Sequence, residues 1–545
     1  MSTPLVYASR STARGGCSVA VRGTYDRRIF PATEDLDMGG FRLKNLGAPL
    51  ESGDAVRWDD LRVGLNYIIG VEWDTSSSSP AMKHIDAYGT EIVKTAEQWA
   101  AWFNAHPIHA NMWRCTLSVA GVPTFGANAR GDGLSLDGSA GQLMVRIPKF
   151  YTKSEKVGTK IRWWISPVAF TGFEVHPAFL QRGGTERAQL YVGAYAGGLA
   201  VNQSTGALYM LSATGKQPWT GTCMGKIPFG SGVTEIVAGN VVTGESSGKT
   251  GTVVAVYKAS GTWGSDAAGF IYVKYPGADW ANWTNPENIQ VSGATVAATT
   301  GTGEALGLTR QNAETYCNNI GSSRWGCENI WTLDAITLLY LIEYANWNSQ
   351  STSVGTGRGI VDKASGTGFS GENNGSFSSD TNIATNGTGT GTGAADGLVP
   401  IVYRGIENLW GNVYQFIIGI DVLDAAYRVL KRDGTGAVAC PLASGQYESS
   451  VAAPVQYADP GNLDSYTKDI LYEDLSKYLI LPNLGGGSDS TYLCDRIYWH
   501  RAGQTNIWLV GGYWNLGAYF GVGSRSAYDV ASRSYRFCGC RLEFL

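Results

Sequence analysis

Apolar residues recur at every second position in several parts of the chain, which is the pattern of β-strands with one buried face. The pattern is clear in residues 142–151 and 160–166, and shorter stretches at residues 173–179 and 191–195 continue it. The chain from about residue 141 onward is therefore expected to be rich in β structure.

Three other segments carry apolar residues at helical spacing, namely residues 95–104, 309–320 and 331–347. Thr95 and Thr332 precede apolar runs, and we expect them to cap the first and third of these helices. The third helix is apolar around most of its circumference, so we expect it to be well buried. Many strands with few helices predict a fold of the α+β class that is β-rich.

Residues 231–303 have the pattern of an inserted β module. They contain at least four short strand patterns separated by glycine-rich turns, at residues 234–243, 252–257, 269–275 and 289–296. This arrangement predicts a small β-barrel or sandwich. Two roles stay open for it, a projecting module that binds carbohydrate and a spacer or trimer brace, of which we favour the second.

Composition adds mainly glycines and aromatic residues to this picture. The 545 residues include 72 Gly, 28 Tyr and 18 Trp, while 16% of residues are charged, against about 25% in typical domains. Such a composition suits turn-rich β structure and broad contacts between proteins. Residues 351–397 consist largely of Gly, Ser, Thr and Asn and predict a long surface loop.

Charge and hydropathy argue against two classes of partner. The net charge is −4 and no block of Lys and Arg occurs, so we expect no nucleic-acid binding. No apolar run reaches the roughly 18 residues of a membrane span, so we expect no membrane insertion. The first ten residues lack an apolar signal core, and we expect synthesis in a cytoplasm without a cleaved signal.

Candidate catalytic chemistry is sparse. His106 and His109 could ligate a metal ion on a helix, but Pro107 between them breaks helical spacing, and His176 is read as a core histidine. One tight group of ionisable residues is read as a surface charge cluster or a salt-bridged loop: Asp495, Arg496, His500 and Arg501. We expect no catalytic residues, no metal ligands and no cofactor.

The cysteines fit packing better than chemistry. The chain has nine of them at scattered positions and no C-x-x-C pair, so a zinc or thioredoxin-like site is not expected. Free Cys packs as a small hydrophobe, and we expect all nine to be buried, reduced thiols.

The last 38 residues have the composition of a binding surface. Tyr, Ser, Gly and Asn are the residues that paratopes use, and here they fill the space between Gly511-Gly512 and Gly539-x-Arg541. We expect Trp508, Trp514, Leu542 and Phe544 to form the buried frame. Roughly half to two-thirds of the following candidate ligand contacts are expected to be exposed: Tyr513, Asn515, Leu516, Ala518, Tyr519, Phe520, Tyr528, Asp529 and Val530.

The N-terminal segment resembles an element that recurs in bacteriophage tail fibres. Residues 38–49 read Met-Gly-Gly-Phe-Arg-Leu-Lys-Asn-Leu-Gly-Ala-Pro, and Asp-Ala-Val follows at residues 54–56. So short an amphipathic unit cannot bury its own apolar face, and association with copies of itself would solve that. The resemblance implies a trimeric stalk segment near the end that attaches to the virion.

A second resemblance covers residues 141–230 and 304–545. Asn408, Trp410, Gly411, Asn412 and Val413 match the G-x-x-N-x-x-G-N-V-x-E-W signature of formylglycine-generating-enzyme-like domains, a branch of the C-type lectin fold. Gln415 and Phe416 replace the usual Glu and Trp. The terminal Gly-Gly-Tyr-Trp and Gly-x-Arg segments follow in the expected order.

The two resemblances together imply a division of the chain. Residues 1–70 would be the virion-attachment and trimerisation segment, and residues 71–140 a connecting α+β region. Residues 141–230 and 304–545 would be a split C-type lectin-like domain around the inserted module at residues 231–303. Whether a Ca²⁺ ion stabilises that domain stays open, because the sequence contains no dense loop of Asp and Asn ligands.

Proteins with this domain include formylglycine-generating oxidases, the phage major tropism determinant and its relatives, and tail proteins that are not diversified. The active-site sequence of the oxidases, with its reactive Cys pair, does not occur here. The tropism determinants resemble this chain in their trimerising N-terminal part and their C-terminal lectin domain, whose variable residues are often diversified by a retroelement.

The resemblance therefore implies a homotrimeric receptor-binding protein, an adhesin of a phage tail rather than an enzyme. It would be located in the virion, bind other tail proteins through its N-terminus, and recognise a bacterial surface protein or glycan. A structural tail-fibre or baseplate protein is the main alternative, and an oxidase on the same fold is the other.

Overall fold

The computed structural model describes residues 6–10, 17–21, 67–221, 224–274, 283–363, 388, 390–423, 426–436, 447–452, 464–474, 476–499 and 504–545. The chain divides into two compact units, Met1–Asn66 and Tyr67–Leu545. In the first unit, β1 (Val6–Arg10) pairs antiparallel with β2 (Cys17–Val21). The stalk motif of residues 38–56 lies outside the described residues.

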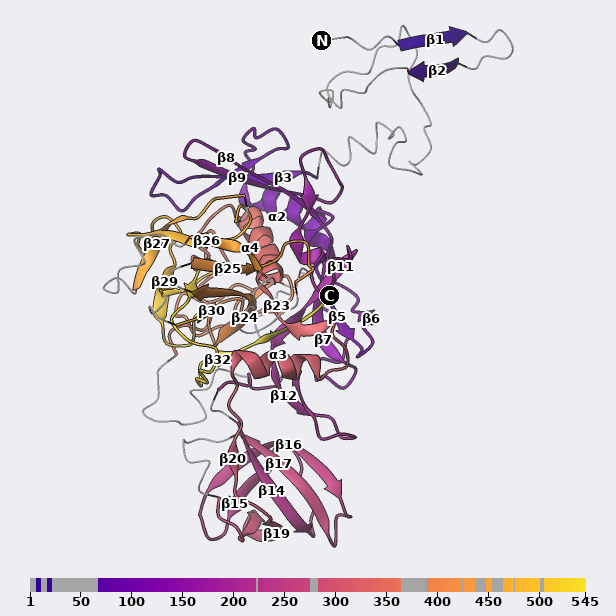
Figure 1. The fold of residues 1–545 in the computed structure, drawn as a ribbon, viewed down its shortest axis with the longest axis vertical. Coiled ribbons are helices and arrows are strands. Elements are labelled where there is room, and N and C mark those ends of the chain that lie inside the picture. Colours follow the sequence, from indigo (N-terminus) through magenta and orange to yellow (C-terminus); the bar gives the residue numbers. More distant parts are fainter. Residues whose placement is uncertain are drawn as a thin grey trace. The chain divides into compact units, whose positions relative to one another are not determined.

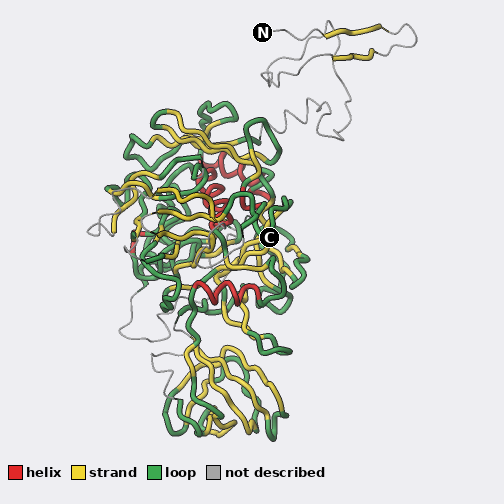
Figure 2. The backbone as a smooth tube through the Cα atoms, viewed as in Figure 1, coloured by secondary structure: helices red, strands yellow, loops and turns green. Residues whose placement is uncertain are grey.

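The second unit is β-rich, as the alternating sequence pattern predicts. Strands and loops make up most of its described residues, with three α-helices among them (Figure 2). None of the described helices is long and apolar enough to cross a membrane.

Two sheets join the start of the second unit to later strands. One has the order β10-β8-β9-β3-β4 and the other the order β21-β33-β11-β7-β5-β6. Their strands are β3 (Ile69–Asp74), β4 (Lys83–Ile85), β5 (Trp113–Leu117), β6 (Pro123–Phe125), β7 (Gln142–Pro148), β8 (Tyr151–Val157), β9 (Lys160–Ser166), β10 (Glu174–Val175), β11 (Gln189–Ala196), β21 (Trp325–Cys327) and β33 (Arg541–Phe544). Because β3 pairs with β9 and β5 with β7, residues 71–140 share sheets with the residues that follow and do not form a separate connecting region.

A nine-stranded sheet holds the C-terminal part of the chain. Its order is β26-β25-β24-β30-β31-β29-β27-β28, with β32 beside β24. Its strands are β24 (Tyr414–Leu423), β25 (Ala426–Leu430), β26 (Tyr447–Ala452), β27 (Asp464–Ile470), β28 (Pro482–Gly485), β29 (Arg496–Tyr498), β30 (Asn506–Val510), β31 (Arg525–Ser526) and β32 (Cys538–Gly539). Two small hairpins also occur, β12 (Gly198–Val201) with β13 (Leu208–Leu211) and β22 (Val402–Tyr403) with β23 (Ile406–Glu407).

The strands between residues 224 and 305 form a closed barrel, which begins and ends slightly outside the expected limits of 231–303. The barrel closes because β14 pairs with both β17 and β19, while β16, β15 and β18 complete the ring and β20 adds to the edge. Its strands lie together at one end of the second unit (Figure 1). They are β14 (Met224–Gly232), β15 (Val241–Gly244), β16 (Thr250–Ser260), β17 (Ala267–Lys274), β18 (Asn288–Val291), β19 (Ala294–Thr299) and β20 (Glu304–Ala305). The barrel has its own core, which includes Phe229, Ile271 and Trp283.

The helices begin where side chains cap them. α2 (Ala96–Ala105) has the expected capping box, in which the Thr95 hydroxyl accepts a hydrogen bond from the Gln98 backbone N–H. The α3 helix spans Arg310–Asn318 and α4 spans Ile330–Tyr344. The expectation that Thr332 caps α4 is wrong, because the Asn329 side chain accepts the backbone N–H groups of residues 331 and 332 instead.

The core explains the high tryptophan content. The α4 helix is buried along nearly its whole length and packs against β3, β9 and β24. The tryptophans whose side chains are fully buried in the described structure are Trp73, Trp164, Trp219, Trp283, Trp325, Trp331, Trp347, Trp410, Trp499, Trp508 and Trp514. These rings therefore build the interior, and the frame residues expected at the C-terminus, Leu542 and Phe544 included, are all buried.

Candidate functional site

The three C-terminal sequence signatures meet in space. The backbone N–H of Gly411 donates to the carbonyl oxygen of Gly511 at 2.6 Å. The Arg541 guanidinium donates to Oε1 of Gln415 at 2.8 Å and to the carbonyl oxygens of Glu407 and Asn408 at 2.6 and 3.0 Å. A buried hydrogen-bond network therefore joins residues 405–415 to both ends of the C-terminal run.

The first loop of the site, residues 511–520, starts from the end of β30. Gly511 and Gly512 have φ values of 84° and 68°, which favour glycine because a Cβ strains the left-handed region. The loop contains the 3₁₀ turn η6 (Gly517–Tyr519). The backbone N–H of Gly517 donates to the carbonyl oxygen of Val361 at 2.8 Å, which holds the tip of the loop on the neighbouring chain.

Two of the nine predicted contact side chains are exposed, fewer than the expected half to two-thirds, and both lie on this loop. They are Asn515 and Tyr519, the latter 40% exposed. The Arg496 guanidinium lies 4.4 Å from the centroid of the Tyr519 ring, and the Tyr466 ring packs against it edge to face at 6.1 Å. The half-buried candidates here are Tyr513, Leu516 and Ala518.

The prediction that Phe520 contacts a ligand is wrong for this structure. Its side chain is 0% exposed and stacks on Tyr498 with ring centroids 5.6 Å apart. A Cβ added at Gly512 would lie 2.6 Å from the Cβ of Phe520, so the two positions pack directly. Phe520 thus anchors the end of the first loop instead of displaying a ring.

The second loop, residues 527–533, carries Tyr528, Asp529 and Val530, which are half-buried. Its backbone follows β30, since the Ile507 N–H donates to the Asp529 carbonyl at 2.7 Å and the Asn506 side chain donates to the Tyr528 carbonyl at 3.0 Å. Val530 therefore lies beside the start of β30, whereas Tyr513 follows the end of β30. The length of the strand separates these two ends by about 13 Å. The predicted residues therefore form two groups.

A stack of aromatic rings extends from Tyr513 of the first group to residues that follow the second loop. Tyr513 and Phe537 stack with centroids 4.5 Å apart, Phe537 and Tyr535 stack at 4.9 Å, and the Arg533 guanidinium lies 5.8 Å from the Tyr535 ring. We call Tyr513, Phe537 and Tyr535 the ring stack. Tyr535 and Phe537 are not among the predicted contact residues, although their alternation in residues 534–538 is a signal that they share one face of an extended segment.

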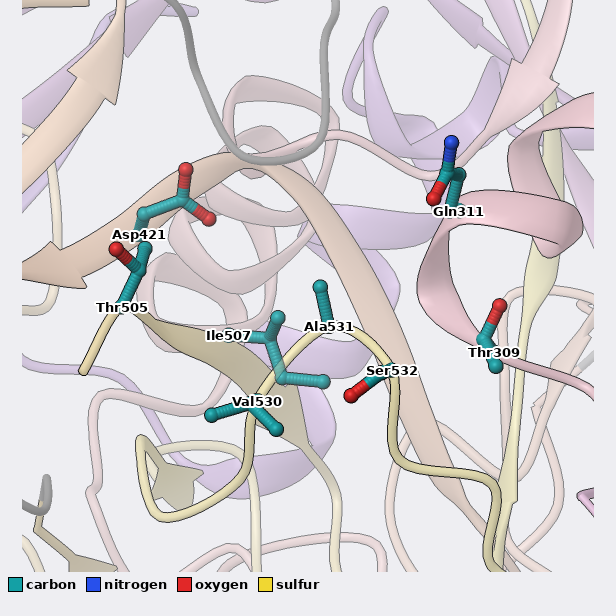
Figure 3. Close-up of a pocket in the computed structure, with 8 residues that line it drawn as sticks. All are labelled: Thr309, Gln311, Asp421, Thr505, Ile507, Val530, Ala531 and Ser532. Atoms are coloured by element: carbon teal, nitrogen blue, oxygen red, sulfur yellow. The ribbon is translucent and has the colours of Figure 1, made fainter.

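A cavity of about 430 Å³ opens beside the second loop (Figure 3). Its lining residues are Thr309, Gln311, Asp421, Thr505, Ile507, Val530, Ala531 and Ser532. Asp421 is buried, and its Oδ1 lies 2.6 Å from Nη2 of Arg310, a buried cation on the first turn of α3. Of the predicted site residues, Val530 lines this cavity.

One member of the expected surface charge cluster or salt-bridged loop, Asp495, does not lie at the surface. The Asp495 carboxylate is buried, and burial raises its pKa to about 7. It accepts hydrogen bonds from the Gly523 backbone N–H at 2.8 Å and from the Gln350 side chain at 3.3 Å. Asp495 thus holds the chain that follows the first loop, while His500 and Arg501 lie outside the described residues.

The cysteines and histidines are packed in the interior. The described cysteines, Cys115, Cys317, Cys327, Cys494, Cys538 and Cys540, are free and buried. Burial raises the pKa of Cys538 well above its usual value, so it is a thiol at neutral pH rather than a reactive thiolate.

His106 and His109 are hydrogen-bonded to each other through their Nδ1 atoms at 3.0 Å, and both Nε2 atoms lie within hydrogen-bond distance of backbone carbonyls. These contacts occupy both rings and argue against the metal alternative. His176 is a buried core histidine bonded to Asp334 at 3.1 Å, as expected. Among the residues that the structure describes, no three His, Cys, Asp or Glu side chains are arranged to hold a metal ion.

No protein-family model matches the chain, and no curated protein is significantly similar to it in sequence.

Proposed function

We propose that this protein is a receptor-binding protein of a bacteriophage tail that recognises a bacterial surface protein or glycan. The observation that carries the proposal is the exposed pair Asn515 and Tyr519 on a loop whose two ends are held by buried groups. Exposed side chains on a firmly held loop suit a ligand-binding surface, because these side chains can be replaced without disturbing the buried groups that hold the fold.

The frame beneath the loop supports this proposal. Gly511 is hydrogen-bonded to Gly411 at one end of the loop, and Gly523 is hydrogen-bonded to Asp495 just beyond the other. Preorganised loops lose less entropy on binding than mobile ones. Tyr and Arg, which dominate the energetics of many interfaces, meet here where Arg496 covers the Tyr519 ring.

The finer fold assignment is also part of the proposal. We infer a C-type lectin-like domain of the formylglycine-generating-enzyme branch, interrupted by the barrel of residues 224–305. Support comes from the network in which Arg541 contacts Gln415 and the carbonyls of Glu407 and Asn408. Gln415, which stands where the signature has Glu, keeps a polar side chain that accepts from Arg541 and donates to Asn408.

The proposal includes a homotrimer that attaches to other tail proteins through its N-terminus. Three copies on one fibre would raise the apparent affinity of individually modest sites through avidity. Light scattering of the purified chain should then give three times the subunit mass of 58.2 kDa. A monomer in solution would contradict this part of the proposal and leave the site itself standing.

Cell binding tests the proposed function. We expect the purified full chain to bind host bacteria, and the double variant Asn515→Ala, Tyr519→Ala to bind at least tenfold more weakly with a nearly unchanged melting temperature. The matched control is Tyr88→Ala, because Tyr88 is an exposed tyrosine, 61% accessible, in a turn outside the site. Undiminished binding by the double variant would refute the assignment of this surface.

Diversification of the site by a retroelement is a separate part of the proposal, and the gene tests it. A near-copy of the 3′ end of the gene, differing mainly at adenines, should lie close to it. The codons for Asn515 and Tyr519 are then expected among the differing positions. A genome without such a copy would show that the binding surface is fixed.

A further inference from the structure

The cavity beside the second loop has two polar walls and an apolar floor. Figure 3 shows Asp421 and Thr505 on one side, Gln311 and Thr309 on the opposite side, and Ile507 with Ala531 between them. The walls come from distant parts of the chain, namely the start of α3, the strand β24 and the segment before β30. Its volume of about 430 Å³ lies within the range of about 300–1,000 Å³ typical of small-ligand sites.

The charge of the cavity is balanced within the protein. Among the lining residues that the structure describes, Asp421 is the only ionisable one, and Arg310 forms an ion pair with it at 2.6 Å while both are buried. An ionic ligand would therefore lose its hydration without gaining a counter-charge. The remaining polar groups are three hydroxyls and one amide, which donate and accept hydrogen bonds without net charge.

We propose that this cavity binds a neutral saccharide unit. The inference rests on the proposed receptor-binding function and names the class of ligand for the second loop. Hydroxyl groups around a sugar ring would meet Asp421 and Thr505 on one wall and Gln311 on the other. The C–H face of the ring would pack on the apolar floor.

The segment that follows the edge of the cavity carries an aromatic ring. Residues 530–532 form one edge of the cavity, and the chain reaches Tyr535 of the ring stack three residues later. Further units of an oligosaccharide leaving the cavity would meet this half-buried ring. Aromatic faces stack on apolar faces of ligands, so the cavity and the ring stack together suit a chain of sugars.

A glycan array probed with the full chain tests this proposal. The array carries neutral hexoses and N-acetylhexosamines beside sialylated and phosphorylated glycans. We expect binding to neutral glycans, with Gln311→Ala and Ser532→Ala each weakening it about fivefold and the double variant more than tenfold. Both side chains are exposed, so neither variant threatens the fold. Asn318→Ala is the matched control, since Asn318 is exposed on the same helix α3 and does not line the cavity.

The outcomes separate this inference from the proposed function. Binding to charged glycans alone, binding to no saccharide, or unchanged binding by the double cavity variant would overturn the inference. If host cells are bound through Tyr519 while neutral saccharides neither bind nor compete, the receptor-binding function stands without it. If neutral saccharides bind in the cavity and no bacterial cell is bound, the saccharide site stands and the proposed function fails.

Discussion

The backbone N–H of Gly523 donates a hydrogen bond to the buried carboxylate of Asp495, with 2.8 Å between the nitrogen and Oδ2. This contact lies between the first loop and β31, where the chain turns back into the nine-stranded sheet. The Val522 N–H donates to the Ser349 hydroxyl at 2.9 Å beside it. Buried polar groups from two distant segments thus fix the backbone that leaves the exposed Tyr519.

Removing the Asp495 side chain should destabilise the protein. We expect Asp495→Ala to lower the free energy of unfolding by about 3 kcal/mol, because buried N–H groups lose their acceptor. Urea denaturation measures this change. The exposed neighbour Asp489 provides the control, since Asp489→Ala should change stability by less than about 0.5 kcal/mol.

The negative charge of the Asp495 carboxylate should not be needed for the stability of the fold. Burial raises its pKa to about 7 from an ordinary value of 3.8, so the folded state binds this proton more tightly than the unfolded state. The stabilising contribution is complete below about pH 4 and is lost as pH rises through 7. Asp495→Asn should therefore be better tolerated at pH 8 than at pH 4.

Two adjacent aromatic residues should behave in opposite ways. Phe520→Ala should cost about 3–5 kcal/mol of stability because it empties a buried position against Tyr498. Tyr519→Ala should cost only about 1 kcal/mol, since the residue is 40% exposed and its ring contacts Arg496 and Tyr466 at the surface. Thermal denaturation of both variants tests the division between anchor and contact residue, and equal losses would contradict it.

The sequence predicts the parts of this fold that follow from local patterns. Period-two alternation places the strands between residues 142 and 195, and the capping box at Thr95 places the start of α2. The buried frame at Trp508 and Trp514 also follows from the size and apolar character of the side chains. These features depend on residues close together in the chain.

The predictions for Thr332 and Phe520 are wrong because other residues contact these two side chains in the folded protein. Thr332 fails as a cap because Asn329 lies one turn earlier and Glu543, more than 200 residues away, accepts the Thr332 hydroxyl. Phe520 is buried because Tyr498 and Gly512 form a place for its ring. Glu543 and Tyr498 both lie far along the chain from the residues that they contact, so composition alone could not separate Phe520 from Tyr519.

We expect the Glu543 side chain on β33 to be needed for the packing of this strand against the start of α4. Its buried carboxylate accepts hydrogen bonds from the Asn329 backbone and side chain, from Thr332 and from Arg182. Glu543→Ala should cost about 4 kcal/mol, because it leaves the Arg182 charge short of a partner. Glu304→Ala, which removes a surface ion pair with Lys226, should cost less than about 1 kcal/mol. Comparable losses for the two variants in urea denaturation would refute this assignment.

The histidine beside α2 should make part of the stability depend on pH. His84 is buried, is hydrogen-bonded to the Ile342 carbonyl at 2.8 Å, and stacks on Trp99. Burial lowers its pKa to about 4 from 6.5, so the unfolded state binds this proton more tightly. The stabilising contribution is present above pH 6.5 and is lost as pH falls toward 4.

Replacing His84 with glutamine removes the titratable group, so the pH dependence of its cost reports on His84 alone. Buried carboxyls with a raised pKa change the stability in the opposite direction over the same pH range. The cost of His84→Gln should therefore be about 2–3 kcal/mol smaller at pH 4.5 than at pH 7.5. Urea denaturation at the two pH values measures it. Ile85→Val, at the buried neighbouring position, should cost the same at both. If the cost of His84→Gln is also the same at both, His84 does not carry the acid sensitivity.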